Sequence, residues 1–219
     1  FSLQDAASFF IAWEVMSFGG AVMILGERLD KGIDRSVFLM LCLLEVGAVV
    51  ILLGLIAFSY AAGGISFSQF ASSAHNLPNA LQFFIGLLFF IGFGAKLGIL
   101  PFYEWFPGAY GGGSGATGAM FSGVILNAAF FAISRVFLTW LTPSIATFTL
   151  AIFVCIIAVI SAILAILYAF QQSDWRRLLS LSSAENASIA VLLVGTAFLF
   201  KEEGLLKLAT LAAVVAYLH

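Results

Sequence analysis

The sequence predicts an all-α membrane protein, a polytopic bundle of about seven transmembrane helices with one helix broken near Lys96 and Pro101. Hydrophobic residues make up 63% of the 219 residues and charged residues only 9%, whereas a soluble domain carries about a quarter charged residues. Runs of about 20 apolar residues, the length that crosses a hydrocarbon layer about 30 Å thick, follow one another along the chain. Several membrane spans are therefore predicted, and a soluble fold is excluded.

The first three spans follow from apolar runs that end at polar connections. Residues 6–25 are the first, because a turn rich in charged residues follows them at 27–35. Residues 37–60 are the second, and a longer polar connection at 61–79 closes it. Residues 80–101 make the third span, which ends at its proline.

The later spans are bounded in the same way. Residues 117–140 and 144–170 are predicted as the fourth and fifth, separated by a short turn that contains a proline. The polar stretch 171–183 precedes a sixth span that ends near Phe200, and 204–219 read as the start of a seventh. Because the chain begins with Phe1 and stops inside an apolar run, we expect 1–219 to be a single transmembrane domain of a longer protein, truncated at both ends.

The loop charges predict an orientation. If the spans alternate, five basic residues fall on one side: Arg28, Lys31, Arg35, Arg176 and Arg177. The opposite connections carry only His75 and Lys201. By the positive-inside rule the first side is cytoplasmic. The connection 102–116 belongs to that side by parity but contains no Lys or Arg.

Composition excludes several classes of function. The net charge is only −2, with no Lys/Arg block for a nucleic-acid partner. Cys42 and Cys155 lie inside apolar runs, where a thiol behaves as a small hydrophobe, and no cysteine or histidine cluster has metal spacing. We expect no metal and no cofactor in this chain.

Four ionisable residues lie within apolar runs, namely Glu14, Glu45, Lys96 and Arg135. Each such group near the centre of a span costs about 2.5 to 3.5 kcal/mol on insertion scales. A single one could be a paired structural ion or could lie near a helix end with its head group at the interface. Four together favour a buried polar path.

Lys96 lies five residues before Pro101, which has no amide hydrogen and whose ring would clash with the carbonyl of residue 97. The helix should therefore break just after the lysine, helped by Gly98. In lipid such breaks are tolerated only where protein or water satisfies the freed backbone groups, and transporters bind ions there. The alternative is a helix that simply ends at Pro101, with Lys96 reaching the interface.

A proton relay follows as a hypothesis. Burial disfavours the charged form of a lysine and a nearby carboxylate favours it, so a Glu/Lys pair that separates and rejoins could load and release a proton. Glu14 is the candidate partner of Lys96.

The glycine-rich stretch 111–115 lacks the ending of a phosphate loop and is predicted to be a turn. Glu185 and Asn186 mark a weaker polar entry to the sixth span.

Four sequence blocks follow one another along the chain, at residues 13–17, 96–107, 122–135 and 172–183. In this order they resemble blocks of the antiporter-like, proton-translocating membrane subunits of respiratory complex I, of Mrp cation/proton antiporters and of the related membrane hydrogenases, including the hydrogenase-4 and formate-hydrogenlyase types. The resemblance implies that Glu14 is the characteristic intramembrane acid and that Lys96 is the pumping lysine on a broken helix. It also implies a larger inverted-repeat transporter fold.

The sequence departs from that pattern at several positions. Asn127 stands where many members of the family carry a relay lysine or histidine, so waters or another group would have to replace it. His219 resembles the first histidine of a later family block, whose broken helix and lysine would lie beyond this chain. Glu45, Asn127, Glu185 and His219 are therefore secondary candidates, beside the primary set Glu14, Lys96 and Arg135, with Arg135 orienting nearby polar groups.

The resemblance implies a proton-translocating subunit, integral to a bacterial or archaeal inner membrane, in a complex-I-like or hydrogenase-type oxidoreductase. Other membrane subunits would be its partners, protons or sodium the transported ions, and the redox centres would lie in partner chains. A stand-alone Mrp-type antiporter subunit and a non-conducting structural subunit remain alternatives.

Overall fold

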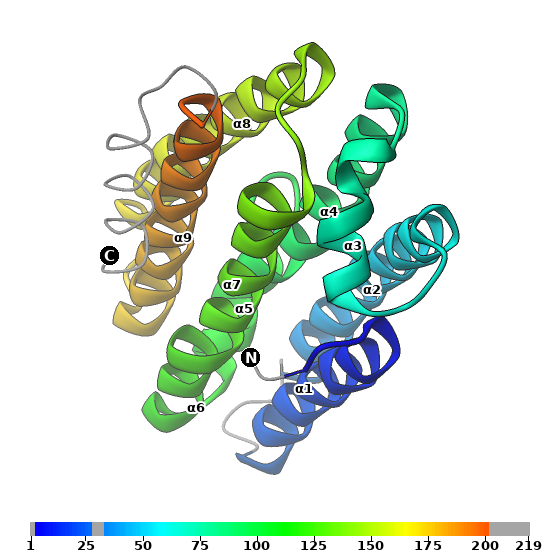
Figure 1. Ribbon diagram of the computed structural model, residues 1–219. Helices are drawn as coiled ribbons and strands as arrows, with labels where there is room; N and C mark the ends of the chain where they lie inside the picture. The colour runs from blue at the N-terminus through cyan, green and yellow to red at the C-terminus, as the bar shows by residue number, and fades with distance from the viewer. Residues whose placement is uncertain (1–2, 28–32, 202–219) are drawn as a thin grey trace.

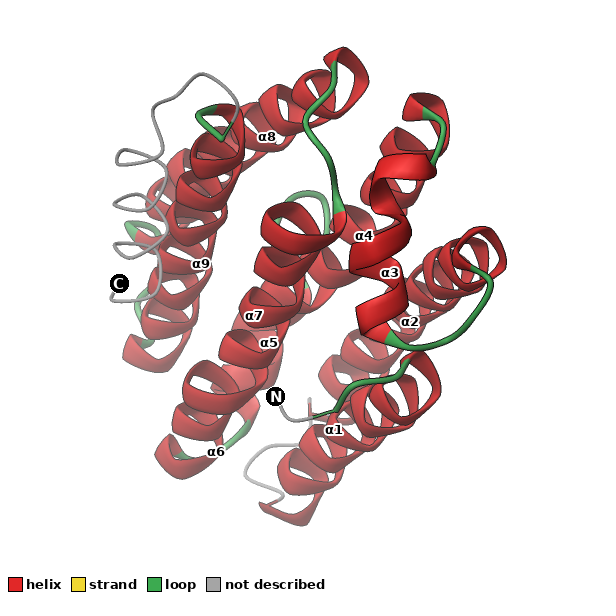
Figure 2. Cartoon of the chain, in the orientation of Figure 1, coloured by secondary structure: helices red, strands yellow, loops and turns green. Residues whose placement is uncertain are grey.

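The computed structural model describes residues 3–27 and 33–201, and every regular element within them is a helix (Figure 2). With η1 a 3-10 helix and η2 and η3 π-helices, the elements are α1 Ala6–Glu27, α2 Ile33–Ala62, α3 Phe67–Ser73, η1 Ala74–Asn76, α4 Asn79–Leu97, α5 Trp105–Gly112, α6 Gly115–Met120, η2 Phe121–Leu126, α7 Asn127–Arg135, η3 Val136–Trp140, α8 Ile145–Ala169 and α9 Trp175–Leu199. The prediction of an all-α membrane protein is confirmed.

Six described helical stretches are long and apolar enough to cross a membrane. They are Ala6–Gly26, Arg35–Ala62, Asn79–Leu97, Gly115–Trp140, Ile145–Ala169 and Trp175–Leu199. The first five agree with the predicted spans. The sixth begins earlier than predicted, inside the polar stretch, because Asp174 accepts a hydrogen bond from the Arg176 N–H and starts the helix there. The predicted start of a seventh span at 204–219 lies outside the described residues.

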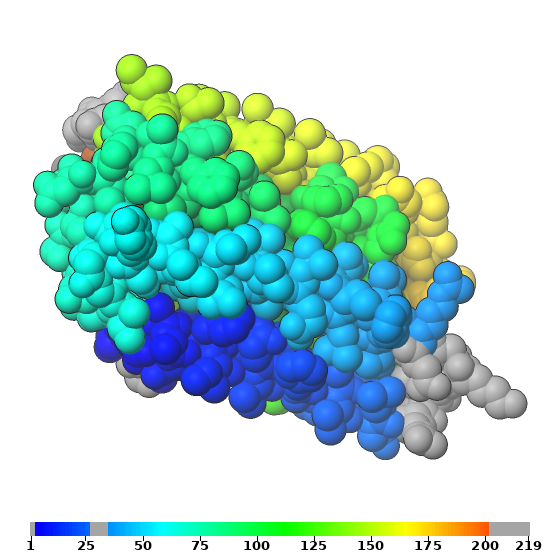
Figure 3. Space-filling view, turned by 90° about the vertical axis from the view of Figure 1, so that its right-hand side faces the viewer, coloured from blue at the N-terminus to red at the C-terminus, as the bar shows by residue number. Residues whose placement is uncertain are grey.

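The long helices form two groups with a middle layer between them (Figure 1). α8 and α9 pack against each other along their length, and α2 packs against both α1 and α4. α5, α6 and α7 lie between the two groups (Figure 1). Seen from the side, α1 and α2 run together along one edge of the surface, with α8 at the opposite edge (Figure 3).

The connections gather at the two ends of the bundle as alternating spans require. The glycine-rich turn lies beside the start of α9, since Arg176 donates from Nη1 to the Gly113 carbonyl at 3.0 Å. The start of α2 is there too, because a Cβ added to Gly108 would lie 2.9 Å from Ser36 Oγ. At the other end the start of α1 meets the α2–α3 connection, where the Ala6 N–H donates to the Ile65 carbonyl at 2.9 Å.

The predicted helix break is present. α4 ends at Leu97, and Gly98 has a φ of 68°, a left-handed conformation that favours glycine. The backbone groups freed by the break find partners: the Trp105 indole donates to the Ala95 carbonyl at 2.9 Å, and the Leu100 N–H donates to Ser161 Oγ at 3.1 Å. The break is therefore satisfied by protein groups, the condition under which lipid tolerates one.

The fourth span has a feature that the sequence did not predict, two π-helical segments on either side of α7. Asn127 Nδ2 donates to the Gly123 carbonyl at 2.8 Å, and Thr139 Oγ1 donates to the Arg135 carbonyl. Side-chain donors that bond to a carbonyl one turn back compete with the regular ladder and distort a helix. Such π-segments are frequent at functional sites.

Gln82 joins two connections at one end of the bundle and is only 2% exposed. Its Nε2 donates to the carbonyls of Ala74 and Leu77, at 3.0 and 3.1 Å. Its Oε1 accepts from the N–H and the hydroxyl of Thr142, at 2.9 and 2.8 Å. One amide side chain therefore uses both of its ends to hold the η1 turn against the turn before α8.

We expect Gln82→Leu to lower the free energy of unfolding by about 2 to 4 kcal/mol, because it leaves several buried polar groups without partners at about 1 to 3 kcal/mol each. Unfolding in detergent micelles, followed by circular dichroism, measures the change. Gln171→Leu alters an exposed glutamine and is the matched control. Equal stability of the two variants would contradict the assigned role.

Candidate functional site

The Lys96 side chain lies deep in the bundle, with 1% of its surface exposed. Its Nζ donates to Ser17 Oγ at 2.7 Å and to the Trp13 carbonyl at 3.2 Å. The ammonium also lies 4.0 Å from the centre of the Trp13 ring, a cation–π contact that stabilises a desolvated charge. The alternative in which Lys96 extends to the membrane interface is therefore wrong for this structure.

Close packing of α2 on α4 fixes the position of this lysine. A Cβ added to Gly47 of α2 would lie 2.8 Å from the Ala95 Cβ and 3.0 Å from the Gly92 carbonyl. Only glycine permits so close an approach of two helix backbones. Because Ala95 precedes Lys96 and the break follows it, the lysine is held at the end of α4, level with the middle of α1.

Two carboxylates lie near the ammonium, Glu14 on α1 and Glu45 on α2. The Oε1 atom of each is inaccessible, and no donor among the residues that the structure describes hydrogen bonds to it. The carboxylates interact electrostatically with each other and with the Lys96 ammonium. The structure therefore brings together three of the four predicted intramembrane charges, Glu14, Glu45 and Lys96.

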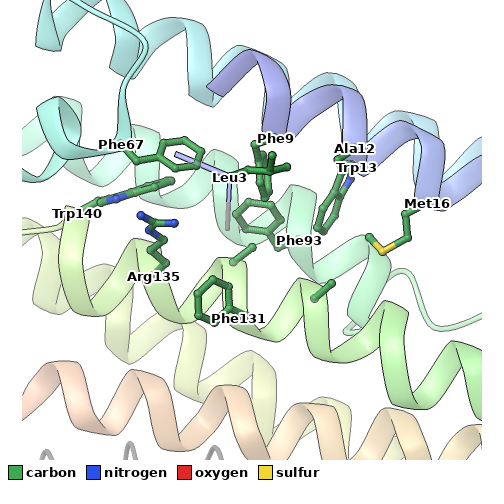
Figure 4. A pocket seen from close by; sticks show the side chains of 12 residues that line it. Leu3, Phe9, Ala12, Trp13, Met16, Phe67, Phe93, Phe131, Arg135 and Trp140 are labelled. Carbon is green, nitrogen blue, oxygen red and sulfur yellow. The ribbon is translucent and has the colours of Figure 1, made fainter. Parts of the chain in front are cut away.

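Arg135, the fourth, lies apart from this group. Its Nη2 donates to Gln4 Oε1 at 3.0 Å, and its guanidinium lies 4.9 Å from the centre of the Phe67 ring. Figure 4 shows Arg135 beside Phe67 and Trp140 at one end of a pocket, with Trp13 at the other end. Arg135 therefore orients Gln4 at the end of the bundle where α1 begins.

The pocket between Arg135 and Trp13 has a volume of about 160 Å³. Its lining is almost wholly apolar and is dominated by the aromatic rings of Phe9, Trp13, Phe67, Phe93, Phe131 and Trp140 (Figure 4). Phe93 lies between Arg135 and Trp13 (Figure 4). The pocket offers space beside the Trp13 ring that covers Lys96, but its walls supply no continuous polar path among the described residues.

The remaining candidates are dispersed. Asn127 is exposed on α7 and uses its amide on its own helix. Glu185 is half-buried on α9, where it lines a pocket of about 330 Å³ with Gln172 and Ser182. His219 lies outside the described residues. None of these joins the group around Lys96 in the part of the chain that is described.

Sequence reasoning gave no role to Trp13 and Ser17, which hold the lysine. Both are buried, at 3% and 2% exposure, and they lie four residues apart, so they share one face of α1. Because Trp13 and Ser17 flank Glu14 at this helical spacing, the sequence could have indicated that they lie together beside the intramembrane charges. No cluster of metal-ligating side chains is present among the side chains that the structure describes, those of residues 3–26 and 35–201.

Comparison with known proteins gives a consistent assignment. The family model described as "NADH:quinone oxidoreductase/Mrp antiporter, TM" matches residues 4–211. Hydrogenase-4 component B of Escherichia coli K12 is 30% identical over 195 residues, which cover 89% of this chain and 29% of that protein. NAD(P)H-quinone oxidoreductase chain 4 1 of Picosynechococcus is 27% identical over 197 residues, covering 90% of this chain and 36% of that protein. The chain spans about a third of the length of these relatives.

Solved structures share the fold at low sequence identity. A chain of respiratory complex I from Thermus thermophilus superposes with a TM-score of 0.77 at 19% identity, over 98% of this chain and 46% of that one. A chain of the Mrp complex from Dietzia gives a TM-score of 0.78 at 16% identity, over 97% of this chain and 23% of that one. A chain of the archaeal membrane-bound sulfane sulfur reductase gives a TM-score of 0.77 at 16% identity, over 98% of this chain and 45% of that one.

Proposed function

Because this chain belongs to the NADH:quinone oxidoreductase/Mrp antiporter transmembrane family, we propose that it is part of a proton-translocating membrane subunit of a complex-I-related oxidoreductase. The observation that carries the proposal is the Lys96 ammonium, 1% exposed at the end of a broken helix and close to two carboxylates. An ammonium held out of water costs free energy. Ionisable residues inside membrane spans are therefore rare, and they typically mark a path for ions or protons.

In this proposal Glu14 and Lys96 are the switching pair. The Lys96 ammonium donates to the neutral acceptors Ser17 Oγ and the Trp13 carbonyl rather than to a carboxylate. A lysine so held gives up its proton more readily than one in a tight ion pair, because no anion stabilises its charge by direct contact. The Glu14 carboxylate, which interacts electrostatically with this ammonium, would be the acceptor of the proton.

The partners follow from the same proposal. Electron transfer and its cofactors would belong to partner subunits of a quinone-reductase or hydrogenase complex, and this chain would contribute the membrane path. Arg135 would act at a distance, by fixing the end of α1 through Gln4.

The proposal is tested by measuring ion flux. The full-length protein that contains this chain, reconstituted in liposomes, is given a potassium diffusion potential, and proton flux is followed with a pH-sensitive dye, with and without a sodium gradient. We expect a potential-driven proton flux that does not require sodium and that the joint replacement Glu14→Gln with Lys96→Met removes.

Other outcomes would decide against the proposal. Proton flux that appears only with a sodium gradient would favour the Mrp-type antiporter. Absence of flux in the parent protein, or full flux in the joint variant, would favour a structural subunit or a path elsewhere. Glu104→Gln, which alters an exposed carboxylate outside the long helices, is the control for reconstitution.

A further inference from the structure

The Ser17 hydroxyl lies between the Lys96 ammonium and the backbone of α1. Its Oγ accepts a hydrogen bond from Lys96 Nζ at 2.7 Å and donates one to the Trp13 carbonyl at 3.1 Å. Nζ donates to the same carbonyl at 3.2 Å. Both side chains are buried, at 2% exposure for Ser17 and 1% for Lys96. The three groups therefore form a closed triangle of buried hydrogen bonds.

One bond of this triangle is ordinary and another is not. A serine in a helix often donates to the carbonyl one turn back, as Ser188 does to the Ala184 carbonyl at 2.8 Å. Ser17 also accepts a hydrogen bond from an ammonium. It lies three residues after Glu14 on the same helix, a spacing at which side chains are neighbours. The serine thus touches the group that is proposed to release the proton.

The donors and acceptors of the three groups determine what happens when that proton leaves. An ammonium offers only hydrogens and a carbonyl only lone pairs, whereas a hydroxyl has one hydrogen and two lone pairs and rotates to suit its neighbours. Once Lys96 is a neutral amine, its nitrogen has a lone pair as well. Among the described residues, Ser17 is the only hydrogen-bond partner of Nζ that can supply a hydrogen to this lone pair.

We propose that Ser17 is a positioning residue of the relay, whose hydroxyl reverses its hydrogen bond as Lys96 alternates between ammonium and amine. The inference rests on the proposed function and deepens it. With the ammonium, the hydroxyl donates to the Trp13 carbonyl. With the amine, it turns and donates to Nζ, while an amine N–H donates to the Trp13 carbonyl. Nζ therefore keeps two hydrogen bonds and the same place in both states.

The transferred proton does not pass through the serine. One N–H bond of the Lys96 ammonium breaks and one O–H bond forms on the Glu14 carboxylate, while the O–H bond of Ser17 stays intact and only rotates. A side chain without a hydroxyl would leave the amine lone pair buried and without a donor, so the lysine would shift. Its position matters because a misplacement of about 1 Å can slow a positioned reaction about 10²-fold.

A pair of β-branched variants isolates the hydroxyl. Ser17→Thr keeps it, and a threonine hydroxyl can bond to the carbonyl one turn back in a helix, whereas Ser17→Val carries a methyl group in its place. The initial rate of potential-driven proton flux is measured with the full-length protein in liposomes. We expect Ser17→Val to lower this rate about 10²-fold and Ser17→Thr to retain most of it.

Ser17→Ala removes the hydroxyl without adding bulk, and it provides the test if the larger variants do not fold. Ser188→Ala is its matched control, because Ser188 is 1% exposed and makes the same bond within its own helix, with no hydrogen bond to a lysine in the described part of the chain. We expect Ser17→Ala to lower the flux as Ser17→Val does and Ser188→Ala to leave it unchanged. Thermal unfolding in detergent micelles shows that each variant has folded.

Three results would overturn the positioning role: equal flux in Ser17→Val and Ser17→Thr, parental flux in Ser17→Ala, or an equal loss in Ser17→Ala and Ser188→Ala. The outcome is distinguishable from that of the proposed function. Parental flux that Lys96→Met abolishes and Ser17→Ala does not would defeat this inference alone. A parent protein without flux would defeat the relay, and the role of Ser17 with it.

Discussion

Replacement of Lys96 by methionine is expected to lower potential-driven proton flux by about 100-fold or more, since a positioned acid or base typically contributes 10²- to 10⁴-fold to a proton-transfer step. Methionine has a similar length and no titratable group, so it fills the space beside Trp13 without carrying a proton. The initial rate of proton flux in liposomes that contain the full-length protein measures the effect.

Lys96→Arg sharpens this prediction. Arginine keeps the positive charge beside Glu14 and Glu45, but its guanidinium does not release its proton in proteins. We expect flux as low as in Lys96→Met, because the residue must release its proton and a fixed positive charge alone is not enough. Flux near the parental rate in Lys96→Arg would limit the role of the residue to charge, and parental flux in Lys96→Met would exclude it from the path.

Lys201→Met is the matched control for both variants. Lys201 also directs its ammonium into the protein, where it donates to the Leu138 carbonyl at 2.9 Å, and burial lowers the pKa of this lysine. It lies at the end of the bundle opposite the basic connections, beyond α9. Its replacement should change stability slightly and leave proton flux unaltered.

Hydropathy predicted the spans because the membrane requires length and apolar composition, and both are local properties. The break after Lys96 was also predictable, because its signals, Gly98 and Pro101, lie within a few residues of each other. The early start of α9 was missed for the converse reason. Its first turns are polar, and a single cap at Asp174, rather than hydropathy, determines where the helix begins.

The neighbours of Lys96 could not be read in the same way. Helices in a membrane are apolar on every face, so periodicity does not say which side packs inward. On α1 the large side chains of Ile11 and Val15 are exposed, while Ser17 is buried. The electrostatic interaction of Glu14 with Glu45 links α1 and α2, and no local pattern in the sequence places these two residues together. It depends on where α2 crosses α1 and α4.

That crossing gives the second large prediction, for Gly92→Val. A Cβ at Gly92 would overlap Ile51 Cγ1 and lie 2.8 Å from the Gly47 carbonyl. Because a backbone carbonyl cannot move aside as a flexible side chain can, α2 and α4 must separate. We expect a loss of about 3 kcal/mol in the free energy of unfolding, the upper part of the range for overpacked cores. Unfolding of the full-length protein in detergent micelles measures it.

Gly19→Val is the control, since Gly19 is exposed on α1 and a Cβ there has nothing within 4 Å among the described residues. Equal stability of the two variants would mean that α2 and α4 are not held by this contact.

If the prediction holds, Gly92→Val should also lower proton flux in the molecules that remain folded. Separating α2 from α4 moves Glu45 away from Lys96, and the energy of two charges falls with their distance. The same contact would then set both the stability of the bundle and the geometry of its buried charges.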